Sequence, residues 1–308
     1  MWSYHSDEDA VNDVLRLSKG MTYKAAMADL PQGGGKAVII GDPRRQKTPQ
    51  MMAAMGKFVD SLGGKYISAE DSGMSVIDLR EMAKHSEYIA GVDAKYHVNG
   101  GIPDGNPAPS TAYGIFIGLQ ATVKYKLKRD LQGVKVAIQG LGHVGYRLAE
   151  HLHENGASLY VTDIYPESLD KAKKAFGAVV VSPDEIFALD VDVFAPCAMG
   201  AAINCHSVSQ LKAKIIAGAA NNQLADESYG SLLAEKGILY APDYVINAGG
   251  IIDIYHQKQP SSAKAMRAHI EKIGDTLVEI YDRATELGLP TNIVANQIAE
   301  ERFGKTKN

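Results

Sequence analysis

Apolar residues follow two different spacings along this chain. In some segments they form short continuous runs, which predict buried strands. In others they return every three or four positions, which predicts helices with one buried face. The two kinds of segment alternate, as in α/β proteins whose parallel strands are joined by helices. Strands are predicted at 37–40, 66–68, 88–92, 134–138, 159–161, 179–181, 191–194, 214–217 and 239–241, and helices at 7–18, 25–28, 51–62, 76–84, 110–125, 144–152, 169–176, 251–255, 263–286 and 291–303.

Loop-forming residues gather between the two halves of this pattern. Residues 93–109 are rich in Gly, Pro and Asn, a composition typical of a linker. We therefore place a domain boundary after residue 106. Ser110 or Thr111 is expected to cap the helix that follows the linker.

A glycine-rich turn stands between a predicted strand and a predicted helix in the second half. Its spacing is G-x-G-x-x-G. Gly140 permits the tight turn, Gly142 lets the backbone approach a pyrophosphate, and Gly145 allows the helix to pack closely on the strand. The order of strand, turn, helix and second strand predicts a dinucleotide site and disfavours an incidental turn that happens to contain glycines.

The residues around this turn indicate which dinucleotide it would bind. His143 and Val144 open the predicted helix, whose free N–H groups and positive dipole end attract phosphates. Asp163 follows the second strand, 23 residues after Gly140, where a carboxylate would bind a ribose 2′-hydroxyl. A 2′-phosphate would meet this carboxylate and no cation nearby in the sequence. NAD is therefore favoured over NADP.

A lysine and an acid stand beside predicted strands in the first half. Lys36 lies between three glycines and the apolar run 37–40, so its flanks would bury it. Burial disfavours the charged form and would lower the pKa of this lysine, although a lysine that snorkels from a strand edge is the alternative. Asp71 follows the next predicted strand, a position that suits a cleft, while solvated loop acids are commoner. Lys24 on its own indicates no more than a solvated helix lysine.

Length and composition exclude several classes of protein. A chain of 308 residues with 45% apolar and 22% charged residues is typical of a globular protein with two domains or one large one. The net charge of −4 gives no electrostatic case for nucleic acid or an anionic membrane. Cys197 and Cys205 form no disulfide framework and no metal-ligand spacing, so no metal is predicted. The acidic start and the lack of a long apolar run argue against a signal peptide or a membrane span, which makes the cytoplasm the default location.

Six separated stretches resemble the glutamate/leucine/phenylalanine/valine dehydrogenase family, and among its branches the leucine dehydrogenases most. They are KGMTYK (19–24), GGGK (33–36), AED (69–71), GLGHVG (140–145), GAANNQ (218–223) and NAGG (247–250). The resemblance implies two domains. Residues 107–289 would form a Rossmann-type, doubly wound parallel-sheet domain for NAD. Residues 1–106, completed by the carboxyl-terminal helix 290–308, would form an α/β domain for substrate binding and oligomerisation.

The same resemblance implies roles for single residues. Lys24 would hold the substrate carboxylate. Lys36 would polarise the carbonyl or activate water at Cα, and Asp71 would be its acid/base partner. The remaining positions would surround the substrate (Ala69, Asn247, Ile251 and Ile254) or hold the dinucleotide (Thr111 and Asn222).

The implied activity is reversible, NAD-dependent oxidative deamination of leucine, valine or isoleucine to the 2-oxo acid and ammonia. Ile254 favours an aliphatic substrate, because glutamate-specific relatives have a small hydroxyl residue there. A homo-oligomer is expected. One alternative is an aromatic amino acid dehydrogenase. Another is a truncated, non-catalytic dinucleotide-binding homologue, because relatives carry a G-G-x-R segment ahead of the equivalent of Met1-Trp2.

Overall fold

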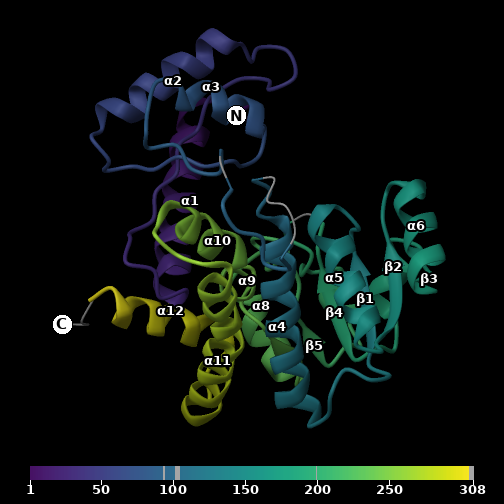
Figure 1. Ribbon diagram of the computed structural model, residues 1–308. Coiled ribbons are helices and arrows are strands. Elements are labelled where there is room, and N and C mark those ends of the chain that lie inside the picture. The colour runs from purple at the N-terminus through teal and green to yellow at the C-terminus, as the bar shows by residue number, and fades with distance from the viewer. Residues whose placement is uncertain (93, 101–104, 199, 305–308) are drawn as a thin grey trace.

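The computed structural model describes residues 1–92, 94–100, 105–198 and 200–304 (Figure 1). Its centre is a parallel sheet with the strand order β3-β2-β1-β4-β5-β6. This is the doubly wound order, in which the chain starts in the middle and builds outward in both directions. The α/β class and the Rossmann-type sheet are therefore confirmed. The strands are β1 (Lys135–Gln139), β2 (Ser158–Thr162), β3 (Val179–Val180), β4 (Val193–Pro196), β5 (Ile215–Ile216) and β6 (Leu239–Tyr240).

Alternate side chains of the strands enter two different cores. In β1, Val136 and Ile138 point into the larger core while Ala137 points into a smaller one. In β4, Val193 points into the larger core and Phe194 into the smaller one. This alternation follows from the pleat, which sends successive side chains to opposite faces. Both faces of the sheet are consequently covered.

Helices cover the two faces unequally. The larger core contains residues of α4 (Ala108–Leu127), α5 (His143–Glu154), α10 (Gly249–Lys258) and α11 (Ala263–Leu287). Gly118 allows α4 to lie close to α11, since a Cβ there would come within 2.9 Å of Leu277 Cδ1. The other face is covered by shorter elements: η1 (Glu185–Ala188), α7 (Ser207–Gln210) and α8 (Tyr229–Glu235). The remaining helices of this half are α6 (Pro166–Phe176) and α9 (Asp243–Ile246).

The start of α4 corrects one prediction. The helix begins at Ala108 with Pro107 as its N-cap, and the Asn106 side chain accepts from the Ala108 N–H at 2.9 Å. Ser110 and Thr111 therefore lie inside the first turn and do not cap the helix. The prediction counted the prolines as loop residues, but the first turn of a helix tolerates proline because its N–H groups have no intrahelical partner.

Two helices near the amino terminus share a small core of their own. Helices α2 (Pro49–Ser61) and α3 (Val76–Ala83) are capped by Thr48 and by a Ser75–Asp78 capping box, respectively. They pack closely at Gly56, where a Cβ would lie 2.4 Å from the Met82 carbonyl oxygen. Their buried contacts come from Met52, Val59, Leu79, Met82 and Ile89. This unit forms the upper part of the molecule in Figure 1.

The three strands predicted in this first half are wrong as regular strands. The described residues form two single-residue parallel bridges there instead, Trp2 with Ile40 and Ser68 with Ile89. The run 37–40 is only partly buried, and Ile40 itself is 50% exposed. Short apolar runs become strands only where neighbouring segments continue the ladder of hydrogen bonds, and each pair of segments here meets at one residue.

Helix α1 (Asp7–Met27) joins the two halves of the molecule (Figure 1). The predicted break between residues 18 and 25 is wrong, because the helix runs through it. Its last turns enter the larger core beside α12 (Thr291–Arg302), where the Tyr23 hydroxyl donates to Glu300 Oε1 at 2.7 Å. Residues 305–308 of the predicted carboxyl-terminal segment lie outside the described residues. Searched over the described ranges, the helices include none that combines the length and hydropathy needed to cross a membrane.

Candidate active site

The glycine-rich loop between β1 and α5 has room for a dinucleotide backbone. Gly140 has φ +100°, which favours glycine, and a Cβ on Gly145 would lie 2.0 Å from the Gly140 carbonyl oxygen. By contrast, a Cβ on Gly142 would meet no atom within 4 Å. Gly142 is also the N-cap of α5, with no capping side chain in the described part of the chain. The loop therefore offers backbone N–H groups beside open space, which suits a pyrophosphate.

The end of β2 places Asp163 against the same loop. Its carboxylate accepts from the Leu141 N–H at 2.5 Å and from the Tyr165 N–H at 2.8 Å. Asp163 is thus fixed at the tip of the glycine-rich turn, where the sequence predicts contact with a ribose. His143 is exposed and begins α5, while Val144 packs partly against the larger core.

Lys36 is fixed against α1 by its glycine-rich approach. A Cβ on Gly34 would lie 1.9 Å from the Thr22 nitrogen, so only glycine lets this segment cross the helix. The Lys36 N–H then donates to Ser18 Oγ at 3.0 Å. The Lys36 ammonium forms an ion pair with Asp71, whose side chain is 56% exposed against 19% for Lys36. The structure thus brings together the two residues predicted to carry the chemistry.

Burial controls the charge of Lys36. Desolvation lowers the pKa of its ammonium, and the negative charge of Asp13 on α1 opposes that shift. This direction agrees with the expectation from the sequence. Asp13 is itself half-buried and accepts a hydrogen bond from the Tyr4 hydroxyl at 2.6 Å.

Lys24 meets two asparagines from the other half of the molecule. Its Nζ donates to Asn221 Oδ1 at 3.4 Å, and Asn247 Nδ2 donates to the same oxygen at 2.7 Å. Asn247 Nδ2 also donates to the Ala219 carbonyl at 3.1 Å. Asn247 Oδ1 is buried and has no hydrogen-bond partner among the described residues. A buried acceptor without a partner is costly, and at this position it would suit a donor on a ligand.

Asp243 is close enough to Lys24 to affect the pKa of that lysine. Burial lowers the pKa of Lys24 to about 8, while Asp243 raises it and Lys36 lowers it further. The Asp243 carboxylate accepts from the Gln223 N–H at 2.8 Å and the Tyr244 N–H at 2.6 Å. Burial raises the pKa of Asp243, and these N–H groups and Lys24 oppose that shift.

Asn221 and Asp243 were not predicted from the sequence as site residues. The prediction named Asn222 of the adjacent pair. Asn222 has φ +50°, and its carbonyl accepts from the Ala201 N–H at 2.7 Å, so its backbone shapes the loop after β5. Its predicted contact with a dinucleotide stays a prediction. Asp243 follows β6 by three residues, and its place near the carboxyl edge of the sheet was the available signal.

Helix α10 brings the remaining predicted residues near α4. A Cβ on Gly249 would lie 2.2 Å from the Ser110 carbonyl oxygen, and one on Gly250 would lie 2.7 Å from Thr111 Oγ1. The Thr111 hydroxyl also donates to the Pro107 carbonyl at 2.9 Å. Thr111 is therefore held beside Gly250 at the start of α10. Gly250 follows Asn247 by three residues, so Thr111 lies near Asn247 as well.

The three residues predicted to surround the substrate side chain lie in different parts of the structure. Ile251 packs partly against the larger core, whereas Ile254 lies beside the linker residues Tyr96 and Pro107. Ala69 is half-buried directly after the bridge between Ser68 and Ile89. The grouping of these three residues around a substrate side chain stays a prediction.

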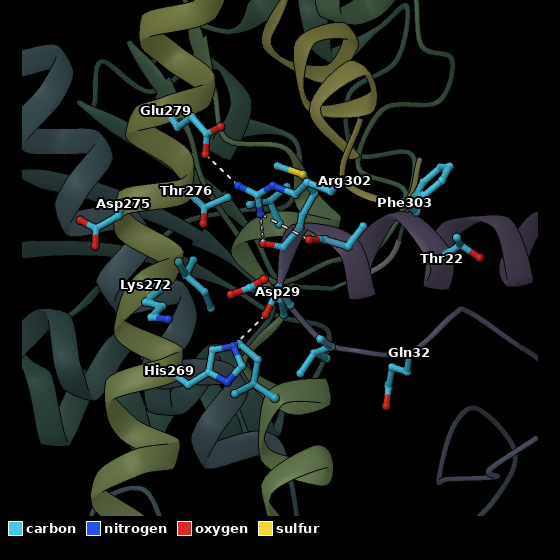
Figure 2. Close-up of a pocket in the computed structure, with 18 of the residues that line it drawn as sticks. Thr22, Asp29, Gln32, His269, Lys272, Asp275, Thr276, Glu279, Arg302 and Phe303 are labelled. Atoms are coloured by element: carbon cyan, nitrogen blue, oxygen red, sulfur yellow. Dashed lines mark hydrogen bonds and ion pairs between the residues drawn. The ribbon is translucent and has the colours of Figure 1, made fainter. Parts of the chain in front are cut away.

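A groove of about 790 Å³ lies elsewhere, between the end of α1 and helices α11 and α12 (Figure 2). It contains none of the predicted site residues. Arg302 reaches across it to Glu279 Oε2 at 2.7 Å and to the Met27 carbonyl at 3.1 Å. Arg302 and Glu279 of the groove are therefore engaged with each other and with the backbone, and the cluster around Lys24 and Lys36, which contains predicted site residues, remains the candidate active site.

Two models of known protein families match this chain. The dimerisation domain of the Glu/Leu/Phe/Val dehydrogenases matches residues 1–88. The model described as Glutamate/Leucine/Phenylalanine/Valine dehydrogenase matches residues 100–165 and 163–290.

Individual relatives are similar over nearly the whole chain. Leucine dehydrogenase of Thermoactinomyces intermedius is 46% identical over 98% of this chain and 82% of its own length. L-Tryptophan dehydrogenase of Nostoc punctiforme is 47% identical over 99% of this chain and 84% of its own. Phenylalanine dehydrogenase of Bacillus thermotolerans is 47% identical over 98% and 80%, respectively.

Solved structures give the same result. The crystal structure of the Nostoc punctiforme L-tryptophan dehydrogenase superposes with a TM-score of 0.85 at 45% identity, covering 98% of this chain and 85% of that one. A hetero-hexameric glutamate dehydrogenase from Thermus thermophilus gives a TM-score of 0.73 at 26% identity, with coverage of 94% and 76%. The chain therefore belongs to the glutamate/leucine/phenylalanine/valine dehydrogenase family.

Proposed function

We propose that this protein is an NAD-dependent amino acid dehydrogenase that converts a branched aliphatic L-amino acid to its 2-oxo acid and ammonia. The observation that carries the proposal is the cluster of Lys24, Asn221 and Asn247, with the unpartnered Asn247 Oδ1 at its centre. A cation beside a free acceptor matches the carboxylate and ammonium of an amino acid. The Lys36–Asp71 pair supplies groups for proton transfer, and Lys36 is close enough to Lys24 to lower its pKa.

Lys24 binds the substrate carboxylate in this proposal, and Asn247 Oδ1 accepts from the substrate ammonium. The two contacts fix the orientation of Cα. Orientation of this kind removes much of the entropic cost of reaction, because the reacting atoms no longer have to find each other.

Lys36 and Asp71 move protons during the hydrolytic half of the reaction. The nicotinamide would accept the hydride from Cα when NAD is bound. Neutral Lys36 then takes a proton from the water that attacks the substrate iminium carbon. Asp71 returns to the amine the proton that it took from the substrate ammonium before the hydride left. The amine departs as ammonia and takes up the proton of the new hydroxyl group, which leaves the 2-oxo acid, and Lys36 then releases its proton to solvent. Burial lowers the pKa of Lys36, which favours its neutral form relative to an exposed lysine, and this is the direction that a proton acceptor needs.

The proposed cofactor is NAD. The glycine-rich loop leaves space for the pyrophosphate beside Gly142, and Asp163 stands at the tip of that loop. A ribose 2′-hydroxyl can donate to this carboxylate, whereas a 2′-phosphate would be repelled by it.

The proposed substrate preference rests on α10. Ile251 and Ile254 are apolar and lie three residues apart on α10, Ile251 against the larger core and Ile254 beside the linker, and in the proposal both contact the substrate side chain. A second substrate carboxylate beside them would lose water without gaining a partner, at a cost on the order of several kcal/mol. An aromatic substrate is the second candidate, because relatives named as tryptophan and phenylalanine dehydrogenases are as similar to this chain as the leucine dehydrogenases.

We further propose the division into residues 1–106, for substrate binding and oligomerisation, and 107–289, for NAD. A homo-oligomer would cover apolar side chains that the first half exposes, such as Phe58, Ile67 and Ile77. A cytoplasmic location is proposed from the composition.

Reduction of NAD or NADP, followed by absorbance, tests the function. The panel contains leucine, valine, isoleucine, phenylalanine, tryptophan and glutamate. The proposal expects the highest kcat/KM with an aliphatic substrate and NAD, and essentially no turnover of glutamate. A higher kcat/KM with tryptophan or phenylalanine would favour the second candidate, and absence of turnover with every pair would overturn the function.

A further inference from the structure

The carboxyl-terminal half of α10 is tied to the linker between the two halves of the molecule through Gln257. Its side chain is 8% exposed. Gln257 Oε1 accepts from the N–H groups of Lys95 at 2.6 Å and Tyr96 at 3.0 Å. Gln257 Nε2 donates to the Tyr96 carbonyl at 2.9 Å and to Asp253 Oδ1 at 2.6 Å. Both lone pairs and both N–H bonds of this amide are therefore used.

Asp253 extends this contact to α4. The carboxylate is buried, and its second oxygen accepts a hydrogen bond from the Ser110 hydroxyl. Burial raises the pKa of Asp253, while the hydrogen bonds from Ser110 and Gln257 oppose that shift. One face of α10 thus holds both the linker segment 95–96 and the start of α4, the helix into which the linker leads.

A second series of hydrogen bonds ties α10 to α1. His256 Nδ1 lies 2.5 Å from Ser261 Oγ, and His256 Nε2 lies 3.0 Å from His269 Nδ1. His269 Nε2 lies 2.7 Å from the Ala28 carbonyl, at the end of the helix that carries Lys24. A carbonyl can only accept, so His269 Nε2 carries a proton. When both rings are neutral, His256 Nε2 then donates to His269 Nδ1.

Tyr96 binds the linker to the residues that follow α10. Its hydroxyl donates to the Ser261 carbonyl at 2.6 Å and accepts from the Ser261 N–H at 3.3 Å. The linker is thus bound both to α10 and to the turn that follows it. These contacts are made by and around α10, which begins two residues after Asn247.

We infer that Gln257 is a positioning residue for the reaction, which holds the linker segment 95–96 on α10 and so sets the distance between the two halves of the active site. The inference rests on the proposed function. The Lys36–Asp71 pair precedes the linker in the chain, and Asn221 and Asn247 follow it. A shift of about 1 Å between such groups can cost on the order of 100-fold in rate, because proton and hydride transfer need close approach.

The test replaces Gln257 by methionine, which keeps the volume and removes all four hydrogen bonds. The expected result is a fall of about 10- to 100-fold in kcat/KM for leucine, with the Kd for NAD within about twofold of wild type. Thr122→Val is the matched control. It removes a buried hydrogen bond at 2.7 Å between Thr122 and Tyr281, far from the linker. This control should lower the melting temperature and leave kcat/KM unchanged.

Hydrogen exchange gives a readout that does not depend on activity. The amides of Lys95 and Tyr96 should exchange at least about 10-fold faster in Q257M than in wild type and T122V, because they lose their acceptor. Tyr96→Phe is a milder second variant that keeps Gln257, and it should show a smaller loss of kcat/KM in the same direction.

Each outcome decides between the two proposals. Faster exchange at these amides together with lower kcat/KM supports the inference. If the wild type turns over no amino acid, the proposed function fails. The hydrogen-exchange rates of the Lys95 and Tyr96 amides in Q257M and wild type then decide whether Gln257 holds the linker. Unchanged exchange and unchanged kinetics in Q257M overturn the positioning role. A lower melting temperature with wild-type kinetics, as in T122V, overturns it as well.

Discussion

At the scale of single residues, the two lysines of the site differ in the partners that surround them. Lys36 has a carboxylate at its ammonium, whereas Lys24 has the amide oxygen of Asn221. Burial lowers the pKa of both. Lys24 is therefore suited to bind an anion while it stays charged, and Lys36 is suited to exchange a proton with Asp71.

Replacement of Lys36 by alanine should abolish turnover and spare the cofactor. We expect kcat to fall by about 100- to 10,000-fold, the range for loss of a general acid–base group. The Kd for NAD, measured by titration of protein fluorescence, should stay near the wild-type value because Lys36 contacts Ser18 and Asp71, which both precede the linker in the chain. Near-native kcat in K36A would remove Lys36 from the chemistry.

The pH dependence of substrate binding should report on Lys24. Burial lowers the pKa of Lys24 to about 8. As pH rises through this value, the lysine loses its charge and with it the attraction for the substrate carboxylate. The KM for the amino acid should therefore increase above about pH 8.

The variant Lys24→Arg shows whether the change of KM with pH comes from loss of the charge at this position. Arginine stays protonated, since its pKa is above about 12. The variant is expected to have a higher KM at neutral pH, because its longer side chain fits the site less well, but a KM that is flat up to about pH 9.5. A wild-type KM that does not change over the same range would contradict the assignment of Lys24.

Single residues also show the limit of what the sequence predicts. The pKa of Lys36 shifts in the predicted direction, but the apolar run that led to the prediction is only partly buried, and the crossing of Gly34 over α1 positions the lysine. The turn at Gly140 follows from spacing alone. The partnership of Lys24 with Asn221 could not be predicted, because it joins positions 197 residues apart. The packing of α1 against α9 and α12 brings them together.

At the scale of elements, helices were easier to predict than strands in the first half. A helix satisfies its own backbone hydrogen bonds, so local spacing and capping residues such as Thr48 and Ser75 suffice to define it. A strand needs a neighbour. The runs 37–40 and 66–68 have the composition of strands, yet each finds one bridging residue in the described structure.

The three glycines around α5 and α1 should respond differently to alanine. In G145A the new methyl would meet the Gly140 carbonyl at 2.0 Å, which should destabilise the fold by about 1–3 kcal/mol. In G142A the methyl would meet no atom within 4 Å, so the melting temperature should hold while the Kd for NAD rises. Gly20→Ala, also in open space and within α1, is the control and should stabilise by up to about 1 kcal/mol.

Thermal unfolding with and without NAD checks this series. A melting temperature of G142A well below that of the wild type would show that the loop is tighter than the structure indicates. Wild-type affinity of G142A for NAD would place the pyrophosphate elsewhere.

At the scale of the whole molecule, stability is unevenly distributed. The larger core combines residues of α1, α4, α11 and the sheet, whereas α2 and α3 share a small core of a few side chains. Little apolar burial holds the α2–α3 unit, so it should open more readily than the rest.

Hydrogen exchange should reveal this difference. Amides of α2 and α3 are expected to exchange through local opening, at rates well above those of α4 and β1. Addition of NAD at about 100 times its Kd should slow exchange in the sheet half, with a stabilisation of about 2.7 kcal/mol, and change α2 and α3 little. Equal protection in both regions would mean that the molecule unfolds as one unit.

The crossing of the glycine segment over α1 has a consequence for redesign. Gly34 packs on Thr22, and the Lys36 backbone is bonded to Ser18, so one rigid helix sets the spacing of both lysines. In the proposed function, these lysines act on the carboxylate, Cα and amino group, which all amino acid substrates share. In that proposal, the part in which substrates differ lies beside Ala69 and α10. An engineer who wants a longer or bulkier side chain accepted would therefore leave α1 intact and vary Ala69 and the isoleucines of α10.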